Sequence, residues 1–398
     1  MRIQTTRKSH ALPLLSAAMV ALSLAACVVD DDAATARSAS ATDSATAANA
    51  DIIATPSYAA FAEDTAGTGA RMARFAAYDT AFKRITSPAT EAKIARFPAT
   101  IPPEGPSTLH VQILLDRANF SPGIIDGMWG DNAAKALRWF RFANGIDTTS
   151  VDGVTDSTAV IDQATYQQLV TVAATTPLIA RYTVTADDVK GPFVRIPEDV
   201  YEQAKLDCLC YASVAEALAE RFHTSTRMLV QLNPGVRMDS ISVGTQLSVP
   251  NVAGPPATPA PPVTQIVISK KNFWLHGLDA SGKIVWHAPS TLGAGYDPSP
   301  DAGDYKVTRI AQNPTFHYQP TLFAEVPDSR PEANLPPGPN SPVGVVWMAL
   351  SKPHYGIHGT SSPETIGYAN SHGCVRLTNW DARELSTTLK AGTPVEFR

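Results

Sequence analysis

The sequence predicts a multidomain protein whose last part is an all-β sandwich with one short helix. Two observations lead to this prediction. A proline- and alanine-rich linker divides the 398-residue chain at residues 252–262. Before it, from about residue 107, apolar residues mostly recur at helical spacing, whereas after it short β-favouring runs alternate with Gly, Pro, Asp and Asn. We therefore expect the β domain to follow a small three-helix domain and a small α+β domain.

The composition shows only a small excess of negative charge. The formal net charge is -5 and the pI is about 6.0. No basic segment stands out, so the sequence argues against nucleic acid as a partner.

The N-terminus predicts export. A basic start precedes an apolar run at residues 11–26, which is short for a bilayer span. The run ends at Leu24-Ala25-Ala26-Cys27, which resembles a bacterial lipoprotein signal. Residues 1–26 would then be a signal peptide and Cys27 would carry lipid; an ordinary secretory signal is the alternative. Because Val28 stands where an aspartate would signal inner-membrane retention, we expect a periplasmic protein anchored to the outer membrane of a Gram-negative bacterium.

The next two segments are less informative. Residues 27–57 are rich in Ala, Thr, Ser and Asp and poor in large apolar side chains, so they predict a disordered tether. Residues 58–106 alternate alanine with larger apolar residues, several of them at helical spacing. We expect a helical segment there, whose docking the pattern does not define.

The three-helix domain is expected at residues 107–176. Helical runs near 111–115, 133–142 and 166–169 are separated by Asp-Gly turns. This arrangement resembles the type-1 peptidoglycan-binding domain, with Trp139-Phe140-Arg141-Phe142 in place of the usual Phe-Gln. An inert spacer with an aromatic core is the alternative.

The α+β domain is expected at residues 181–251. A β-favouring run at each end flanks helical patterns at 214–222 and 224–232, and the second pattern runs into Leu-Asn-Pro-Gly. The order of strand, two helices and strand resembles a LysM domain, a glycan-binding fold. An insertion at residues 186–211 departs from that family.

The insertion contains Cys208 and Cys210. An exported protein enters an oxidising compartment, where free thiols are uncommon, so the state of these two cysteines needs an explanation. A disulfide between them would be strained in a regular strand or helix, although a distorted loop can hold one. A metal-binding pair is the alternative, but no matching His or Cys pair lies nearby. On either interpretation we expect Cys374 to keep its thiol.

The last domain, residues 263–398, is predicted from a series of short strands. The β-favouring runs are 265–269, 273–276, 283–286, 305–308 and 343–350, with a closing strand at 394–397. One helix, at about 379–389, interrupts the series. This pattern favours a sandwich or barrel.

One motif in this domain predicts an activated thiol. The stretch Ser371-His372-Gly373-Cys374-Val375-Arg376-Leu377 and the upstream loop 355–360 place Cys374 near two histidines and an arginine. A free cysteine with a pKa of about 8.5 needs a histidine, a cation or a helix N-terminus to favour the thiolate. The motif offers all three, and backbone N–H groups at the start of the helix could stabilise an oxyanion.

The same residues carry a resemblance to a known family. Ile357-His358-Gly359-Thr360, the motif around Cys374 and the approach segment 338–344 are similar to the YkuD-like L,D-transpeptidase catalytic domain. The resemblance implies an acyltransferase in peptidoglycan biosynthesis and cell wall organisation. Cys374 would attack a stem peptide at diaminopimelate, D-alanine would leave, and the acyl group would pass to an amine, forming a 3-3 cross-link or anchoring an outer-membrane protein. It implies no cofactor.

The resemblance also implies roles for individual residues. His358 would be the base, oriented by the carbonyl of Gly359. The residues expected to bind substrate are His372, Ser371, Gly373, Arg376 and Tyr355. His372 as the base, Arg376 paired with Asp381 or Glu384, and Tyr355 packed in a strand are the alternatives, and His354 and His317 are expected at the surface.

Other functions fit parts of the pattern. An L,D-carboxypeptidase or amidase-type hydrolase would use the same thiol with water as acceptor. A zinc hydrolase could use His358, His372 and Cys374, but no helical His-x-x-x-His or suitably placed glutamate accompanies them. A non-catalytic wall-binding lipoprotein is the remaining alternative.

Overall fold

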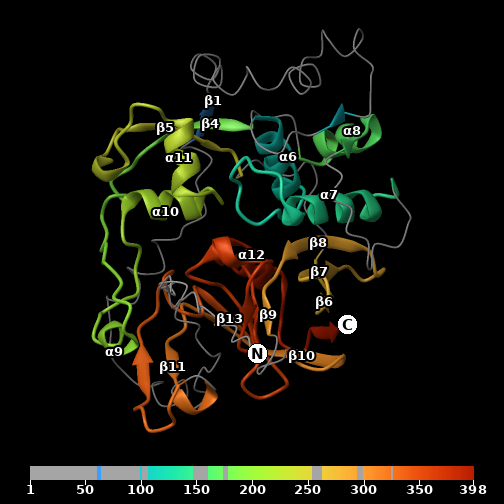
Figure 1. Cartoon of the computed structure of the whole chain (residues 1–398). Coiled ribbons are helices and arrows are strands. Elements are labelled where there is room, and N and C mark those ends of the chain that lie inside the picture. Colours follow the sequence, from blue (N-terminus) through green and yellow to red (C-terminus); the bar gives the residue numbers. More distant parts are fainter. Residues whose placement is uncertain are drawn as a thin grey trace, which may run out of the picture.

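The structure is a computed structural model that describes residues 61–63, 99–100, 106–146, 160–173, 178–252, 262–293, 299–323 and 326–398. The expected signal peptide (1–26), the tether with Cys27 (27–57) and the central part of the linker (253–261) lie outside the described residues. We name three parts: a helical unit (106–173), an α+β unit (178–252) and a sheet domain (262–398). In Figure 1 the first two lie side by side above the sheet domain.

The helical unit contains α6 (Pro106–Arg117), α7 (Asp131–Ala143) and α8 (Gln163–Ala173). Its buried side chains, among them Leu115, Phe140 and Leu169, form one core with Val267 and Trp274 of the sheet domain. The three helices therefore bury their apolar faces partly against the sheet, and the core of the unit continues into the sheet domain.

The α+β unit is built on the antiparallel pair β4 (Ile179–Thr183) and β5 (Gln246–Pro250). Helices α10 (Val214–Arg221) and α11 (Thr226–Leu232) begin at the serine N-caps Ser213 and Ser225 and are followed by the 3-10 turn η4 (Met238–Ser240). Such caps satisfy amides that the first helical turn leaves without partners. Tyr182, Phe222 and Leu247 lie in the core of the unit.

The insertion expected at 186–211 forms an arm that reaches from the α+β unit to the sheet domain (Figure 1). Its short helix α9 (Val200–Gln203) lies against strand β12 (Ala333–Leu335). The structure joins Cys208 and Cys210 in a disulfide, so neither thiol is left for a metal pair. Leu209, between them, is fully buried among residues of the sheet domain.

The helical prediction for residues 58–106 is wrong where the structure describes them before α6. Residues Phe61–Glu63 form strand β1, which pairs with β4, and Ala99–Thr100 form β2, which pairs with β3 (Val160–Ile161). Strand pairing at a sheet edge supplies the hydrogen bonds of these backbones, and this outweighs the helical spacing of the side chains. The rest of the segment lies outside the described residues.

The sheet domain contains one eight-stranded sheet in the order β16-β14-β13-β10-β17-β6-β7-β8. The strands are β6 (Gln265–Ser269), β7 (Trp274–Leu278), β8 (Ile284–Pro289), β10 (Gly303–Gln312), β13 (Val346–Leu350), β14 (Gly356–His358), β16 (Val375–Arg376) and β17 (Pro394–Phe397). We predicted a sandwich or barrel, and the sandwich is corrected to one continuous sheet. The reason is β10, whose first half pairs with β17 and whose second half pairs with β13, with a register shift inside the second pairing.

Smaller elements complete the sheet domain. These are the pair β9 (Leu292–Gly293) and β15 (Asn370–Ser371), the hairpin β11 (Phe316–Tyr318) and β12, the 3-10 turns η5 (Pro320–Leu322) and η6 (Pro363–Thr365), and helix α12 (Asn379–Thr388). Leu385 of α12 packs in a core with Ile266, Met348 and Val375. The helix thus covers the half of the sheet that holds β13 and β14.

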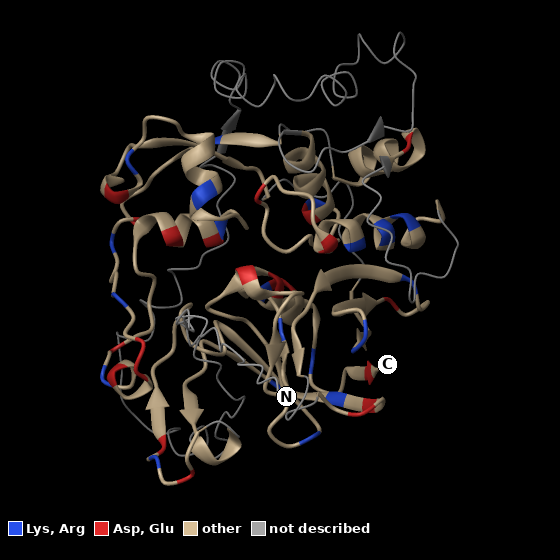
Figure 2. Cartoon of the chain, viewed as in Figure 1, with Lys and Arg blue, Asp and Glu red and all other residues tan. Residues whose placement is uncertain are grey.

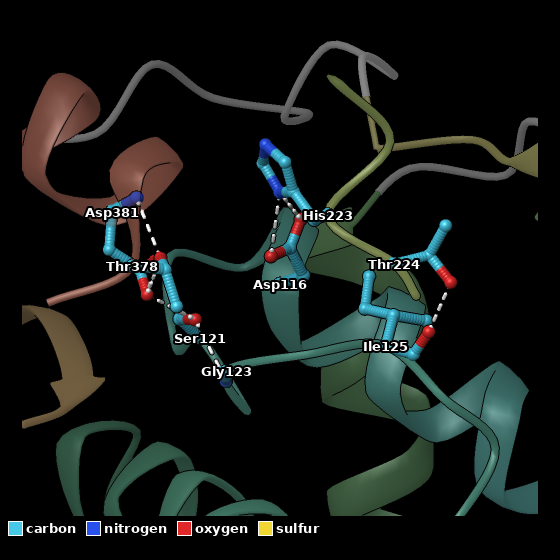
Figure 3. Close-up of polar contacts among 8 residues, drawn as sticks. All are labelled: Asp116, Ser121, Gly123, Ile125, His223, Thr224, Thr378 and Asp381. Atoms are coloured by element: carbon cyan, nitrogen blue, oxygen red, sulfur yellow. Dashed lines mark hydrogen bonds and ion pairs between the residues drawn. The ribbon is translucent and has the colours of Figure 1, made fainter. Parts of the chain in front are cut away.

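The three parts meet at a buried polar junction, shown in Figure 3. His223 Nδ1 of the α+β unit lies 3.1 Å from both carboxylate oxygens of Asp116, at the end of α6. Ser121 donates to Asp381 Oδ2 of α12 at 3.1 Å, and Thr378 donates to the same oxygen at 2.6 Å. Figure 2 shows acidic residues on α12, while charges of both signs are interspersed elsewhere. None of the described helices has the length and apolar character of a bilayer span.

Candidate active site

The parallel pair β14 and β16 brings together the two motifs that the sequence predicts to be catalytic. Ile357 lies opposite Val375 and His358 opposite Arg376. The amide of Leu377 donates to the His358 carbonyl at 2.8 Å, which extends the pairing by one residue. Because Cys374 directly precedes β16, this register places its backbone beside β14.

The side chain of His358 has a defined tautomer. Its Nδ1 lies 2.6 Å from the carbonyl oxygen of Gly359. A carbonyl oxygen can only accept, so Nδ1 carries the proton and Nε2 carries the lone pair. The ring of Trp347 stacks on the imidazole with centroids 5.3 Å apart. The residue is fully buried, and these two contacts orient the ring.

The electrostatic surroundings keep this histidine neutral. Burial, and next the charge of Arg376, lower the pKa of His358 to about 3, while the hydrogen bond to Gly359 acts in the opposite direction. Burial also lowers the pKa of Arg376 to about 10, so this guanidinium stays charged at neutral pH. At neutral pH His358 is therefore a neutral imidazole that can accept a proton at Nε2.

Cys374 is 1% exposed, and its Sγ lies 3.7 Å from the carbonyl oxygen of His354. The expectation that it keeps its thiol differs from the structure, in which Cys374 is disulfide-bonded. That expectation reserved Cys27 for lipid, and Cys27 lies outside the described residues. Chemistry at this sulfur belongs to the reduced protein, since the thiolate is the nucleophile.

The turn before the cysteine is held by two hydroxyl groups. Ser371 Oγ donates to the Cys374 carbonyl at 2.5 Å, and Ser299 Oγ donates to the Gly373 carbonyl at 2.8 Å. Gly373 has a φ of 105°, in the region that favours glycine. In the structure Ser371 and Gly373 thus shape the backbone around the sulfur.

The helix predicted at about 379–389 is confirmed by α12, but its N-terminus does not lie directly at Cys374. Strand β16 follows the cysteine, and α12 begins only at Asn379. The first-turn amide of Asp381 is capped by Thr378 Oγ1 at 3.1 Å. Pairing with β14 extends the backbone after the cysteine and separates it from the start of the helix.

The other residues predicted to bind substrate differ in burial and in their contacts. His372 is half-buried, with its ring 5.2 Å from that of Phe323. Arg376 is 6% exposed, and its backbone exchanges two hydrogen bonds with Thr291. Tyr355 is half-buried below the ammonium group of Lys352, 4.3 Å from the ring centroid.

The two histidines expected at the surface differ from each other. His354 is exposed and has a φ of 64°. His317 is half-buried in strand β11 of the hairpin, where its Nε2 lies 3.0 Å from Glu332. Within the ranges that the structure describes, no three His, Cys, Asp or Glu side chains are grouped so as to hold a metal ion.

Comparisons with known proteins identify the family. The profile of the YkuD L,D-transpeptidase catalytic domain matches residues 263–397. The L,D-transpeptidase YkuD of Bacillus licheniformis is 30% identical over 182 residues, which are 46% of this chain and 92% of that protein. The chain belongs to the L,D-transpeptidase family.

Other L,D-transpeptidases show a similar extent of likeness. YbiS of Escherichia coli is 29% identical over 184 residues, which are 46% of this chain and 59% of that protein. The catalytic domain of the Enterococcus faecium L,D-transpeptidase is 23% identical in structure alignment, with a TM-score of 0.27, and the match covers 34% of this chain and 96% of that one.

The structure adds residues that the L,D-transpeptidase motif did not indicate. Trp347 stacks on His358, Ser299 holds the cysteine turn, and Asn379 contacts the loop after His358. Trp347 could have been noticed as an aromatic residue in a predicted strand. The contacts of Ser299 and Asn379 connect distant segments, and no local pattern marks them.

Proposed function

We propose that the protein is a cysteine-dependent L,D-transpeptidase that acts on peptidoglycan stem peptides. The observation that carries the proposal is the hydrogen bond between His358 Nδ1 and Gly359, on the strand that pairs with the one following Cys374. It gives the histidine the tautomer that a base requires, beside the cysteine motif. Membership of the L,D-transpeptidase family supports the same activity.

Acylation of the reduced protein follows from this geometry. The Cys374 sulfur attacks the carbonyl carbon of the third stem residue, diaminopimelate, while His358 Nε2 takes the thiol proton. The tetrahedral intermediate then collapses, the bond to D-alanine breaks, and His358 returns the proton to the departing amine. The product is a thioester on Cys374.

Deacylation reuses the same groups. An acceptor amine attacks the thioester, His358 takes a proton from the amine, and the sulfur leaves as a thiolate that is reprotonated. An amine of a second stem gives a 3-3 cross-link, and an amine of an outer-membrane protein gives an anchored protein. Water as the acceptor would make the protein an L,D-carboxypeptidase.

Arg376 has the position to assist both steps. Its charge acts on His358 strongly enough to lower the pKa of that histidine. The same field favours the thiolate over the thiol at a neighbouring sulfur. We assign Arg376 to thiolate stabilisation and to binding of a substrate carboxylate, and His372 and Tyr355 to the substrate surface.

The preceding units have roles outside the chemical step. We propose that the helical unit and the α+β unit bind the cell wall, as their resemblance to peptidoglycan-binding and LysM domains implies. We also propose that Cys27 carries a lipid that anchors the protein to the outer membrane, on its periplasmic side.

Mass spectrometry of reaction products tests the enzymatic proposal. The full chain, with reductant present, is incubated with disaccharide-tetrapeptide stems. We expect D-alanine release, a thioester on Cys374 and a dimeric product, with all three absent in Cys374→Ala. A chelator should leave the reaction unchanged. Loss of the reaction on addition of the chelator would favour the zinc hydrolase. D-alanine release without dimer indicates the carboxypeptidase, and no D-alanine release from the reduced protein refutes the proposal.

A further inference from the structure

The side chain of Asn379 lies beside the loop that follows His358. The residue is 1% exposed and begins α12. Its Oδ1 accepts hydrogen bonds from the amides of Thr360 at 3.1 Å and Val345 at 3.2 Å. A Cβ atom on Gly359 would overlap this oxygen, so glycine at that position allows the close approach.

The contact with Thr360 acts on the acceptor of the catalytic histidine. The peptide unit between Gly359 and Thr360 carries both groups: its carbonyl accepts from His358 Nδ1 and its amide donates to Asn379. A trans peptide is planar, so its N–H and C=O point in fixed, opposite directions. Holding the amide against Asn379 therefore fixes the direction in which the carbonyl meets the imidazole.

The orientation of the Asn379 amide is itself determined. Its Nδ2 donates to Glu220 Oε2 at 2.9 Å and to the Pro339 carbonyl at 3.0 Å. Two backbone donors surround the oxygen and two acceptors surround the nitrogen. The reversed amide would place like groups against each other, so only one orientation satisfies all four hydrogen bonds.

Glu220 belongs to a different part of the protein. It lies on α10 of the α+β unit, and its other carboxylate oxygen accepts from the Tyr211 hydroxyl at 2.8 Å. Burial raises the pKa of Glu220 to about 7. Both its ionised and its protonated form keep an oxygen that can accept from Asn379.

We propose that Asn379 is a positioning residue for His358, and that Glu220 of the α+β unit holds the Asn379 side chain in the orientation that this role requires. The catalytic consequence rests on the proposed transpeptidase function. The chain of contacts is Glu220 to Asn379, Asn379 to the Thr360 amide, and the Gly359 carbonyl to His358. The α+β unit then contributes to the chemical step as well as to the shape of the protein.

Two measurements distinguish a positioning role of Asn379 from a purely structural one. The first is the tautomer of His358, read from ¹⁵N–¹H spectra of the reduced full chain, with the signal assigned by its loss in His358→Gln. The second is the separation of kcat from KM for D-alanine release. We expect the Nδ1–H tautomer in the wild type and a mixture of tautomers in Asn379→Ala. We expect kcat to fall about 10- to 100-fold with KM unchanged, the size of effect known for residues that orient metal-binding histidines.

Variants of α10 test the contribution of the α+β unit. Glu220→Ala should change the tautomer and kcat in the same direction as Asn379→Ala, whereas Glu220→Gln, which keeps an acceptor oxygen, should restore both. Glu216→Ala is the matched control, because Glu216 accepts from Asn340 at 2.8 Å across the same interface without touching Asn379. We expect it to behave like the wild type.

Several outcomes would overturn the proposal. These are an unchanged tautomer in folded Asn379→Ala, equal effects of Glu216→Ala and Glu220→Ala, or a rise in KM alone. If Asn379→Ala does not fold, the three variants on α10 decide. If the wild type releases no D-alanine, the transpeptidase proposal fails, while the tautomer comparison still decides the role of Asn379.

Discussion

At the scale of single residues, the pair His358 and Arg376 combines two requirements that oppose each other. A base must be neutral before it accepts a proton, and a thiolate needs positive charge nearby. A buried arginine next to a buried histidine meets both, because the charge that favours the thiolate also disfavours the imidazolium. In the proposed mechanism a single charge therefore serves both requirements.

This arrangement predicts the effect of removing the cation. In Arg376→Met the pKa of His358 should rise from about 3, because the charge of Arg376 lowers it. It should stay below 6.5, the value from which burial, the larger cause, lowers it. An NMR titration of the His358 ring measures the change. Arg383→Met is the control, since Arg383 does not contribute to this pKa, and an unchanged value in Arg376→Met would contradict the assignment.

The local parts of this site could be predicted from the sequence, and the distant ones could not. His358 and Gly359 are adjacent, so their contact needs only the conformation of one loop. Asn379 contacts Glu220, 159 residues away, and that pairing depends on how two units dock. The bonded state of Cys374 likewise depends on which cysteines approach each other, which spacing along the chain does not determine.

At the scale of elements, the arm between β4 and α10 fixes the α+β unit to the sheet domain. The amide of Leu209 donates to the Pro337 carbonyl at 3.0 Å, and the Leu209 carbonyl accepts from the amide of Asn340 at 2.9 Å. Its side chain packs with Phe316, Val343 and Cys374. Leu209 therefore contributes both backbone hydrogen bonds and apolar packing next to Cys374.

Truncation of this side chain should destabilise the whole protein. Leu209→Ala should lower the free energy of unfolding by about 2–5 kcal/mol, as other buried leucines do when cut to alanine. Denaturant titration monitored by tryptophan fluorescence gives the value. Val230→Ala, at a side chain that is 50% exposed, is the control and should change it by less than about 0.5 kcal/mol. A small effect at Leu209 would mean that the arm docks loosely.

The strands were the most predictable elements, and their arrangement was the least. The β-favouring run at 265–269 coincides with β6, because three consecutive β-branched residues after a proline-rich linker define a strand locally. Nothing local indicates that β10 pairs with both β13 and β17. The expected sandwich failed at this strand, where long-range pairing decides the topology.

At the scale of the whole molecule, the polar junction makes stability depend on pH. Burial raises the pKa of Asp381 to about 8 and that of Glu384 to about 7. At His223 burial lowers the pKa, but Asp116 and neighbouring acids outweigh it and the net shift is upward. Groups with a raised pKa in the folded state stabilise it at low pH, and this stabilisation is lost as the pH rises through the folded pKa.

Replacing one acid should remove part of this dependence. Between pH 6.5 and 8 the unfolded chain has lost the proton that Asp381 retains when folded, so wild-type stability should fall. In Asp381→Asn the fall should be smaller by up to about 2 kcal/mol, since one pH unit corresponds to about 1.4 kcal/mol per proton. Denaturation at both pH values measures it. Asp239→Asn, an exposed acid whose pKa is lowered, should leave the dependence unchanged.

The core shared by α7 and the sheet has a consequence for the exchange of domains in engineering and evolution. Trp139 contacts Trp274 with ring centroids 5.1 Å apart and His276 at 4.3 Å. His276 in turn lies 3.0 Å from His287 on the next strand. A binding domain joined only by a linker can be replaced as a cassette. Here a recombinant chain would have to inherit the matching face of β7 and β8 together with the helices, so the helical unit and the catalytic sheet form a single unit of exchange.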